Sequence, residues 1–382
     1  MGRELVGTAV LLISIVLVLA VMFAVPWWVL VAGPTGRSGT AYRIGTGACV
    51  VGYVCVPVAM VLGHGPPQFD PAAIVGDVAL GVLWVVFVWS LIGLVVRGGL
   101  GVAGVKGLRT TRGVAVAVVV VSLGLSVFGV YEARRIPQVR TVDIAIPGLA
   151  DGLDGLRVVV ITDTHFAALD REQWSKGVVD RVNAQRPDIV GLAGDLVDGS
   201  VHKRRDQVAP LAGVEAPLGR FYITGNHEYL DDAQSWIDYM ASIGWQPLHN
   251  AHRTVDRDGD RLVVAGIDDP AGADVAGHGP DLPAALAGTD PALPVVLLAH
   301  QPKQVADSSA AGVELQISGH THGGQIWPFH YLVRLDQPVV QGLSKHADNT
   351  QLYTSRGTGY WGPPMRVFAP SEITVLVLHP QR

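Results

Sequence analysis

The chain has 382 residues, enough for two or three domains, and carries a formal net charge of −5 at pH 7. Hydrophobic residues make up 49% of it and charged residues only 16%, which excludes an ordinary soluble enzyme of this size. The negative net charge gives no basic footprint for nucleic acid, so we expect no nucleic-acid partner.

The apolar residues are concentrated in the first third of the chain. Four runs there, 5–31, 44–62, 78–96 and 113–130, contain no charged residue. Each run meets or nearly meets the roughly 20 apolar residues that a helix needs to cross a bilayer core. Core helices of a soluble domain would show a polar face, and the first run is too long for a cleaved signal peptide. The sequence therefore predicts an all-α region of four transmembrane helices over residues 1–131, in an integral cell membrane protein.

Basic residues in the short loops predict the orientation of these helices. The second loop has no Lys or Arg, whereas the first and third loops and their edges contain six: Arg37, Arg43, Arg97, Lys106, Arg109 and Arg112. An excess of Lys and Arg marks the cytoplasmic side, although Arg134, Arg135 and Arg140 after the last span weigh against this assignment. We expect both chain ends, and everything after residue 130, to lie outside the cytoplasm.

The pattern changes after a predicted linker, residues 132–154, which contains prolines and several charges. Helical spacing of apolar residues over 171–185 and 232–243 alternates with short runs that are typical of strands. "DRDG" at 256–259 is typical of a hairpin turn. The sequence therefore predicts an α/β domain over residues 155–382. Its strands are expected at 157–161, 188–192, 220–224, 261–267, 294–298 and 313–317.

Polar side chains that can bind metal follow five of these strands. They are Asp163 and His165, Asp195 and Asp198, Asn226 and His227, His300, and His320 and His322. Because α/β folds build their sites at one edge of the sheet, we expect these side chains to lie close together. His320 and His322, the last pair, are separated by one residue, and alternate side chains of an extended segment point to the same face about 6.6 Å apart. The two glycines that follow allow a sharp turn and close approach.

The ligand types constrain the metal. Imidazole, carboxylate and amide groups without any thiolate suit Mn, Fe or Zn. Seven candidate ligands, with His227 and Asp198 left out, are too many for one ion, so we expect two divalent ions that share a carboxylate, about 3.5–4 Å apart. Such a pair suits phosphoryl displacement, because it polarises the phosphate oxygens and generates hydroxide at neutral pH.

Asp-x-His, Gly-Asp-x-x-Asp, Gly-Asn-His-Glu, a strand-end His and Gly-His-x-His occur in this order from about residue 155 to the C-terminus. This series resembles the calcineurin-like metallophosphoesterase superfamily. "GHTHGGQI", "GIDDP" and "SRGTGYWGPPMR" resemble its membrane-associated bacterial, phosphodiesterase-like branch, whose members act on phosphodiester or lipid-linked phosphate substrates. The resemblance implies a two-sheet α/β sandwich and a dinuclear metal-dependent phosphoric ester hydrolase.

The resemblance also implies a role for each site residue. Two groups of three would hold the two ions and one carboxylate would bridge them: Asp163, His165 and His322; Asn226, His300 and His320; and Asp195. His227 would stand beside the leaving group as general acid, oriented by Asp198. Gly199 stands where the protein phosphatases of the superfamily carry a phosphate-binding Arg, which argues against a phosphoprotein phosphatase.

An apolar run over 326–335 directly follows the histidines. If exposed, it favours a lipid-linked substrate or a membrane surface; otherwise it simply packs against the fold. Asp77, at the start of the third span, would be a functional residue inside the membrane or an interfacial one. We therefore expect a membrane-anchored phosphoesterase that hydrolyses a phosphodiester or lipid-linked phosphate. The alternatives are a membrane sensor or transporter that a phosphoesterase-like domain regulates, and a non-catalytic metal-binding module.

Overall fold

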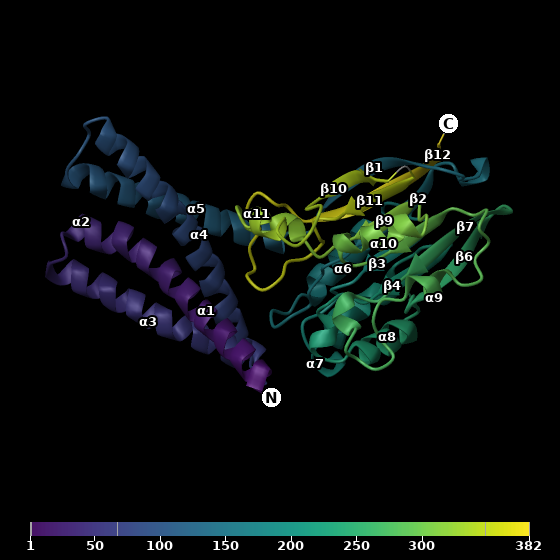
Figure 1. The fold of residues 1–382 in the computed structure, drawn as a ribbon, viewed down its shortest axis with the longest axis horizontal. Coiled ribbons are helices and arrows are strands. Elements are labelled where there is room, and N and C mark those ends of the chain that lie inside the picture. Colours follow the sequence, from purple (N-terminus) through teal and green to yellow (C-terminus); the bar gives the residue numbers. More distant parts are fainter. Residues whose placement is uncertain (1, 67, 348, 382) are drawn as a thin grey trace. The chain divides into compact units, whose positions relative to one another are not determined.

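The computed structural model describes residues 2–66, 68–347 and 349–381 (Figure 1). The chain forms two compact units. The first, the helical unit, comprises Met1–Val130 together with the short segment Gly362–Met365; the second, the α/β unit, comprises Tyr131–Trp361 and Arg366–Arg382.

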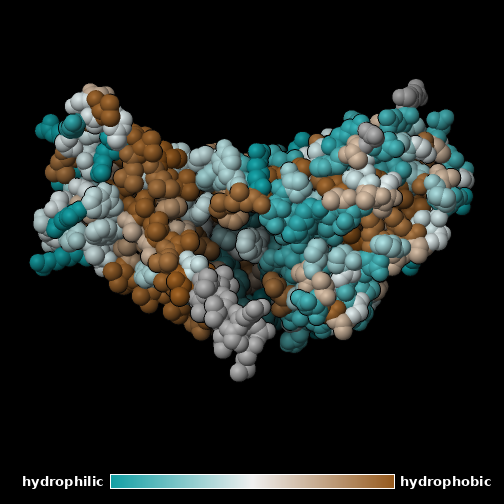
Figure 2. All heavy atoms as spheres, viewed as in Figure 1, coloured by the Kyte–Doolittle hydropathy of each residue, from teal (hydrophilic) through white to brown (hydrophobic). Residues whose placement is uncertain are grey.

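The four long apolar helices predicted from the sequence are confirmed, and each is long enough to cross a membrane. They are α1 (Gly2–Pro26), which continues through the π-helical turn η1 (Trp27–Ala32) and α2 (Gly33–Thr35); α3 (Gly39–His64); α4 (Asp70–Val102); and α5 (Leu108–Arg134). Hydrophobic residues cover the middle of the visible surface of these helices, and hydrophilic residues gather at one end (Figure 2), as expected for helices that face lipid. The protein is therefore a membrane protein.

Asp77 lies on α4 and is buried within the helical unit. Its Oδ1 lies 2.9 Å from Nε2 of His64, the last residue of α3. At this end the two helices approach closely, because a Cβ on Gly63 would lie only 2.4 Å from the backbone of Ala73. Small residues commonly allow such close approach between membrane helices. The carboxylate thus has a partner, and the contact ties α3 to α4.

The α/β unit contains two six-stranded mixed sheets. The first has the strand order β1-β12-β2-β3-β4-β5 and the second β10-β11-β9-β8-β7-β6. The neighbours β2 to β5 are parallel, as are β7, β8, β9 and β11. The strands are β1 (Gln138–Ile146), β2 (Leu156–Ile161), β3 (Ile189–Ala193), β4 (Gly219–Ile223), β5 (Gln246–Pro247), β6 (Ala251–Arg257), β7 (Asp260–Gly266), β8 (Val295–Leu298), β9 (Leu315–Ser318), β10 (Gly342–His346), β11 (Thr350–Thr354) and β12 (Glu372–Pro380).

The two sheets enclose one apolar core, and helices cover their outer faces. Val158 and Val160 of β2 meet Leu298 of β8 in this inner core. Val159 and Ile161 point to the opposite face, where they pack in a cluster with residues of α6 and α8. Strands that are buried on both faces are mainly apolar, as the segment 158–161 of β2 is. The helices are α6 (Glu172–Asn183), α7 (Val201–Val208), α8 (Ala233–Ser242), α9 (Leu282–Leu286), α10 (Val305–Ala310) and α11 (His330–Val333).

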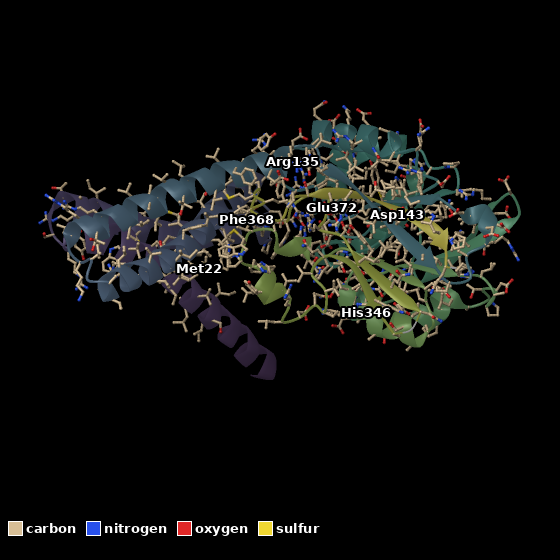
Figure 3. All side chains as sticks on the ribbon, turned by 90° about the horizontal axis from the view of Figure 1, so that it is seen from above. Met22, Arg135, Asp143, His346, Phe368 and Glu372 are labelled. Carbon is tan, nitrogen blue, oxygen red and sulfur yellow. The ribbon has the colours of Figure 1, made fainter. Side chains whose placement is uncertain are left out.

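This two-sheet α/β sandwich confirms the predicted fold class. The hairpin at 256–259 is also confirmed, because Asp258 and Gly259 both take positive φ in the turn between β6 and β7. The segment expected to be a linker, 132–154, instead contains β1, which pairs with β12. Of the β1 side chains only Ile144 and Ile146 are fully buried, whereas others, such as Asp143 (Figure 3), are exposed. An edge strand with so few buried residues resembles a linker in sequence.

Candidate metal centre

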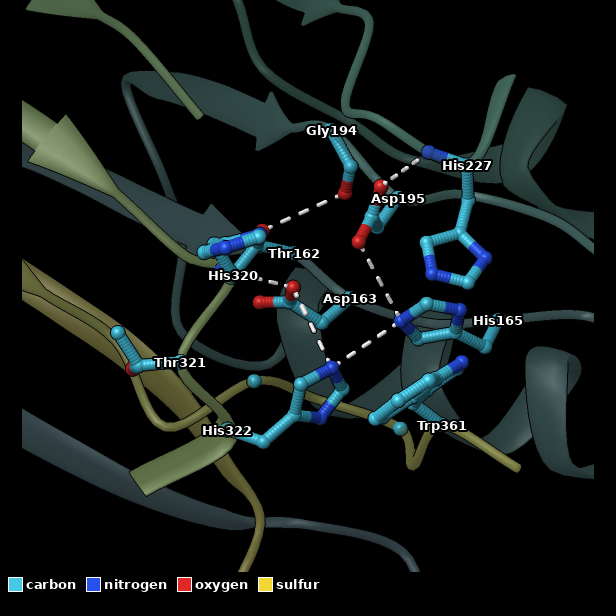
Figure 4. Close-up of polar contacts among 12 residues, drawn as sticks. Thr162, Asp163, His165, Gly194, Asp195, His227, His320, Thr321, His322 and Trp361 are labelled. Atoms are coloured by element: carbon cyan, nitrogen blue, oxygen red, sulfur yellow. Dashed lines mark hydrogen bonds and ion pairs between the residues drawn. The ribbon is translucent and has the colours of Figure 1, made fainter. Parts of the chain in front are cut away.

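The candidate ligands follow strands of both sheets and meet at one place (Figure 4). β2, β3 and β4 are parallel neighbours in the first sheet, and β8 and β9 are parallel neighbours in the second. Their carboxyl ends therefore face the same edge of the sandwich. All seven residues predicted as ligands, together with His227 and Asp198, are linked there by the contacts given below.

One group of four side chains offers ligand atoms within 4.8 Å of one another: Asp163, His165, Asp195 and His322. The Nε2 atoms of His165 and His322 face each other at 3.1 Å. Asp163 Oδ1 lies 3.6 Å from His322 Nε2, and Asp195 Oδ2 lies 3.6 Å from His165 Nε2. A tetrahedral ion with bonds of about 2.0 Å separates its ligands by about 3.3 Å. The spacing fits one such ion.

A second group contains Asp195, His300 and His320. His300 Nε2 lies 3.1 Å from Asp195 Oδ2, and His320 Nδ1 lies 2.9 Å from Oδ1 of Asn226. Among the metal-binding groups found in the described chain, Asp195 is shared by these two. The geometry matches the predicted bridging position, while the role of each ligand stays a prediction.

The backbone is strained at the ligands. Positive φ angles occur at Asp163 (54°), His165 (43°), Asp195 (50°), His320 (69°) and His322 (51°). A side chain with a Cβ rarely adopts this conformation, which raises the energy by roughly 1–3 kcal/mol per residue. Such outliers cluster at functional sites, where the surrounding structure holds them in place. The concentration of strain marks this strand edge as the functional site.

Glycines before the ligand residues make room for carboxylates. A Cβ on Gly225 would lie 2.2 Å from Asp195 Oδ1, and a Cβ on Gly319 would lie 2.3 Å from Asp163 Oδ2. Real Cβ contacts are never this short, so both positions require glycine. These contacts explain why the motifs Gly-Asn-His-Glu and Gly-His-x-His both begin with glycine. The sequence alone gave no reason for it.

Two buried polar atoms show that the site fits a cation. Within the described chain, Asp163 Oδ2 is buried and makes no hydrogen bond, and the buried His300 Nε2 has Asp195 Oδ2 at 3.1 Å but without hydrogen-bond geometry. A buried polar atom without a partner is destabilising, and each such atom needs an explanation. A carboxylate oxygen and an imidazole nitrogen are both metal ligands, so a bound ion would give each of them a partner. The donor set therefore fits the two divalent ions that the sequence predicts.

Burial and charge favour the metal-binding forms of three of the proposed ligands, His320, His322 and Asp195, whereas the pKa values of Asp163 and His300 are raised. Burial and the charge of His300 lower the pKa of His320 to about 3. Burial and the charge of His165 hold the pKa of His322 well below its usual value. Burial would raise the pKa of Asp195, but the charges of His300 and His227 keep it well below its usual value. Metals bind neutral imidazole and ionised carboxylate, and these two imidazoles and Asp195 are in those forms at neutral pH.

His227 and Asp198 form a pair beside the proposed ligands. His227 Nδ1 lies 2.5 Å from Asp198 Oδ1, which also contacts His165 Nδ1 at 3.1 Å. Burial lowers the pKa of His227, but the charges of Asp195 and Asp198 outweigh it and raise the pKa to about 10. Trp361, which the sequence analysis did not single out, packs edge to face on the His227 ring with its side chain half exposed (Figure 4).

Two buried charged residues were also missed. Glu228 accepts hydrogen bonds from the backbone N–H groups of Asp195, Leu196, Val197 and Gly225, so it joins the loops after β3 and β4. Arg366 donates to the backbone oxygens of Gly359, His322, Ala369 and Arg356. The sequence did contain a signal for both residues, because Glu228 ends the motif Gly-Asn-His-Glu and Arg366 ends the motif "SRGTGYWGPPMR". A charged residue inside such a motif indicates a buried hydrogen-bonding role as well as a catalytic one.

The fold and site define a class of protein: an α/β sandwich that gathers candidate ligands for two metal ions at its strand ends. Residues 156–324 match the model of the calcineurin-like phosphoesterase family. The chain is 37% identical over 255 residues to a metallophosphoesterase of Helicobacter pylori, a match that covers 66% of this chain and 67% of that protein. The chain belongs to the calcineurin-like metallophosphoesterase family, which implies a dinuclear divalent metal centre.

Two further relatives show the range of the similarity. A zebrafish (Danio rerio) protein named "Transmembrane protein with metallophosphoesterase domain" is 36% identical over 271 residues, which are 69% of this chain and 62% of that protein. A metallophosphoesterase of Aquifex aeolicus is 30% identical over 226 residues, 58% of this chain and 85% of that protein. The chain thus spans less than two thirds of the length of the zebrafish relative. The name of that relative supports the assignment of this chain to the membrane-associated branch of the family.

The first prediction concerns the bridging position. In full-length protein purified in detergent with excess Mn²⁺ or Zn²⁺, Asp195→Ala should lose more metal than any other single ligand change, because its carboxylate serves both groups. Elemental analysis measures the loss, with Asp206→Ala, whose carboxylate is 90% exposed, as control. If Asp195→Ala loses no more metal than Asn226→Ala, the bridging role is wrong.

The second prediction concerns Gly319. Gly319→Ala places a methyl group 2.2 Å from Thr162 Oγ1 and 2.3 Å from Asp163 Oδ2, so Asp163 must move. A ligand shift of this size should lower kcat/KM on a phosphodiester by about 10²-fold. Gly213→Ala is the control, because its new Cβ would meet no atom closer than 3.6 Å. Equal activities of the two variants would contradict the close-contact argument.

Proposed function

We propose that the protein is a membrane-anchored phosphodiesterase that hydrolyses a phosphodiester or lipid-linked phosphate outside the cytoplasm. The observation that carries the proposal is the His227–Asp198 pair next to Asp195. The backbone N–H of His227 donates to Asp195 Oδ1 at 2.9 Å, and the ring Nδ1 of His227 contacts Asp198 Oδ1. Both the backbone and the ring of His227 are therefore held beside the proposed ligands. A pKa of about 10 keeps its ring protonated at neutral pH in the metal-free chain.

The roles of the residues follow from this arrangement. The ions, when bound, polarise phosphate oxygens and lower the pKa of water; the proposed holders are Asp163, His165 and His322 for one ion, Asn226, His300 and His320 for the other, and Asp195 for both. Asp198 accepts a hydrogen bond from the Nδ1–H group of His227 and so fixes the orientation of the ring. Nε2 of His227 is then the atom that gives a proton to the leaving oxygen.

Gly199 supports a diester over a monoester substrate. Its φ of 122° lies in the region that favours glycine, and a Cβ there would lie 3.3 Å from Arg204 Nε. The nearby Arg204 Nε donates to the backbone oxygen of Asp198. A phosphomonoester dianion carries one more charge than a diester and gains more from an added cation. Because Gly199 offers no cation, the site is better suited to a diester.

The run at 326–335 supports a lipid-linked substrate. Its first residue, Ile326, is buried, so this part packs against the fold. Tyr331, Leu332 and Leu335, in and beside α11, have 60%, 49% and 84% of their surface exposed. Clustered exposed apolar side chains favour contact with lipid or a membrane surface. The exposed part of the run is therefore the proposed lipid-contacting surface.

The third prediction tests the acid role. His227→Ala should keep its metals yet lose about 10²- to 10⁴-fold in kcat on an alkyl phosphodiester, because the alkoxide leaving group needs a proton. The loss on a nitrophenyl ester should be much smaller, since that leaving group departs as an anion. His202→Ala, a change at an exposed histidine on α7, is the control. Equal losses of His227→Ala on both esters would refute the acid role.

The fourth prediction tests the side of the membrane. The α3–α4 connection contains no Lys or Arg, whereas the α1–α3 and α4–α5 connections do, so the α/β unit should lie outside. Alkaline phosphatase fused after Arg382 should be active, and a fluorescent protein fused there should be dark. The opposite result would place the α/β unit in the cytoplasm and leave the chemistry untouched.

The fifth prediction tests the lipid-contacting surface. Full-length protein in mixed micelles should hydrolyse a long-chain lipid phosphodiester with a higher kcat/KM than its soluble short-chain analogue. Changing both Leu332 and Leu335 to Ser should remove that preference while sparing the soluble ester, because both side chains are exposed. Leu343→Ser, at a 41% exposed position on β10, is the matched control. A preference that survives the double change would exclude this surface.

A further inference from the structure

A separate cluster of metal-binding side chains lies outside the dinuclear centre. His249 lies between β5 and β6, Asp268 follows β7, and His278 lies in the loop before α9. Each offers one ligand atom, and these atoms lie within 4.8 Å of one another. We propose that these residues form a third metal site, which binds one zinc-like divalent ion. The proposal does not depend on the proposed function, because no residue is shared with the dinuclear centre.

The geometry suits a small tetrahedral ion. The two oxygens of Asp268 each face a different imidazole: Oδ1 lies 2.7 Å from His249 Nδ1 and Oδ2 lies 3.6 Å from His278 Nδ1. These distances bracket the ~3.3 Å that separates ligands around a tetrahedral zinc ion. The side chains of Asp268 and His278 are 2% and 7% exposed, whereas that of His249 is 34% exposed. The site is thus buried on two sides and open to entry on the third.

The donor set and its supporting contacts point to the same ion. Two imidazoles and one carboxylate with an open fourth position are typical of zinc. Around them, Asp268 Oδ2 accepts from the N–H of Gly279, and Asn250 accepts from the N–H of Asp268 and donates to the oxygen of Gly279. Such outer contacts fix the orientation of ligands. They hold the His278 loop against the strand end that carries Asp268.

An ion here would connect three segments that lie far apart in the sequence. The segment 249–250, the end of β7 and the loop that carries His278 would share it. This loop contacts the segment that follows His227, since the rings of His278 and Tyr229 pack edge to face with their centroids 5.5 Å apart. On the other side, Asp269 accepts from Gln301, the neighbour of His300. A bound ion would therefore join and stiffen segments that support both parts of the dinuclear centre.

Metal stoichiometry tests the site in the full-length protein in detergent. Stripped protein is titrated with Co²⁺, whose absorption reports coordination, and the bound metal is counted by elemental analysis. His249→Ala should bind one ion fewer per chain than the unchanged protein, and so should His278→Asn. His252→Ala is the matched control: this neighbouring histidine has its Nδ1 2.8 Å from the oxygen of Ala285 and should keep every ion.

The same difference is measured in an Asp195→Ala background, which separates this ion from the dinuclear pair. There, His249→Ala should still lose one ion, whatever happens to the proposed function. His249 is partly exposed, so its variant is expected to fold, and circular dichroism checks this. If both His249→Ala and His278→Asn bind as many ions as the unchanged protein, the cluster is only a hydrogen-bonded group and the proposal is wrong.

Discussion

The burial of two carboxylates at the ends of neighbouring parallel strands is the constraint on which the rest of the α/β unit depends. Asp163 follows β2 and Asp195 follows β3, and both are almost fully buried. Each accepts a backbone N–H from a loop of another strand: Asp163 from His320 at 2.8 Å and Asp195 from His227 at 2.9 Å. Because buried charge is destabilising unless it is compensated, these loops converge on the carboxylates. The backbone contacts that hold the carboxylates thereby position the histidines.

Two further buried ionisable residues stabilise this convergence. Glu228 receives the N–H groups of the loop after β3, and burial and the charge of Asp195 raise its pKa to about 8. Arg366 donates to the backbone oxygen of His322 and so holds the loop after β9. Groups that satisfy so many backbone atoms hold the loops in one conformation, so the left-handed φ angles at the ligands persist. Rigid support of this kind is what a catalytic site requires.

The sequence predicted what depends on local pattern and residue chemistry. Apolar runs located the membrane helices and the central strands, and ligand types after strand ends located Asp163, Asp195 and His320 together. It did not predict features that depend on tertiary contacts. β1 pairs with β12, more than 200 residues away, and buries too few side chains to be recognised. His249, Asp268 and His278 belong to no common motif and meet only because β6 and β7 pair and the following loop folds back. Their proximity had no signal in the spacing.

The two kinds of metal-binding group differ in backbone strain, which indicates their roles. Among the described residues, positive φ occurs at five of the seven proposed ligands of the dinuclear centre, but at none of His249, Asp268 and His278. A structural ion only has to join segments, so its ligands can lie on relaxed backbone. A catalytic centre must fix several ligands around positions that stay open to substrate, and the strain of roughly 1–3 kcal/mol at each ligand is offset by surrounding contacts. Strain therefore separates the proposed dinuclear centre from the proposed third site, although both are built from histidine and aspartate side chains.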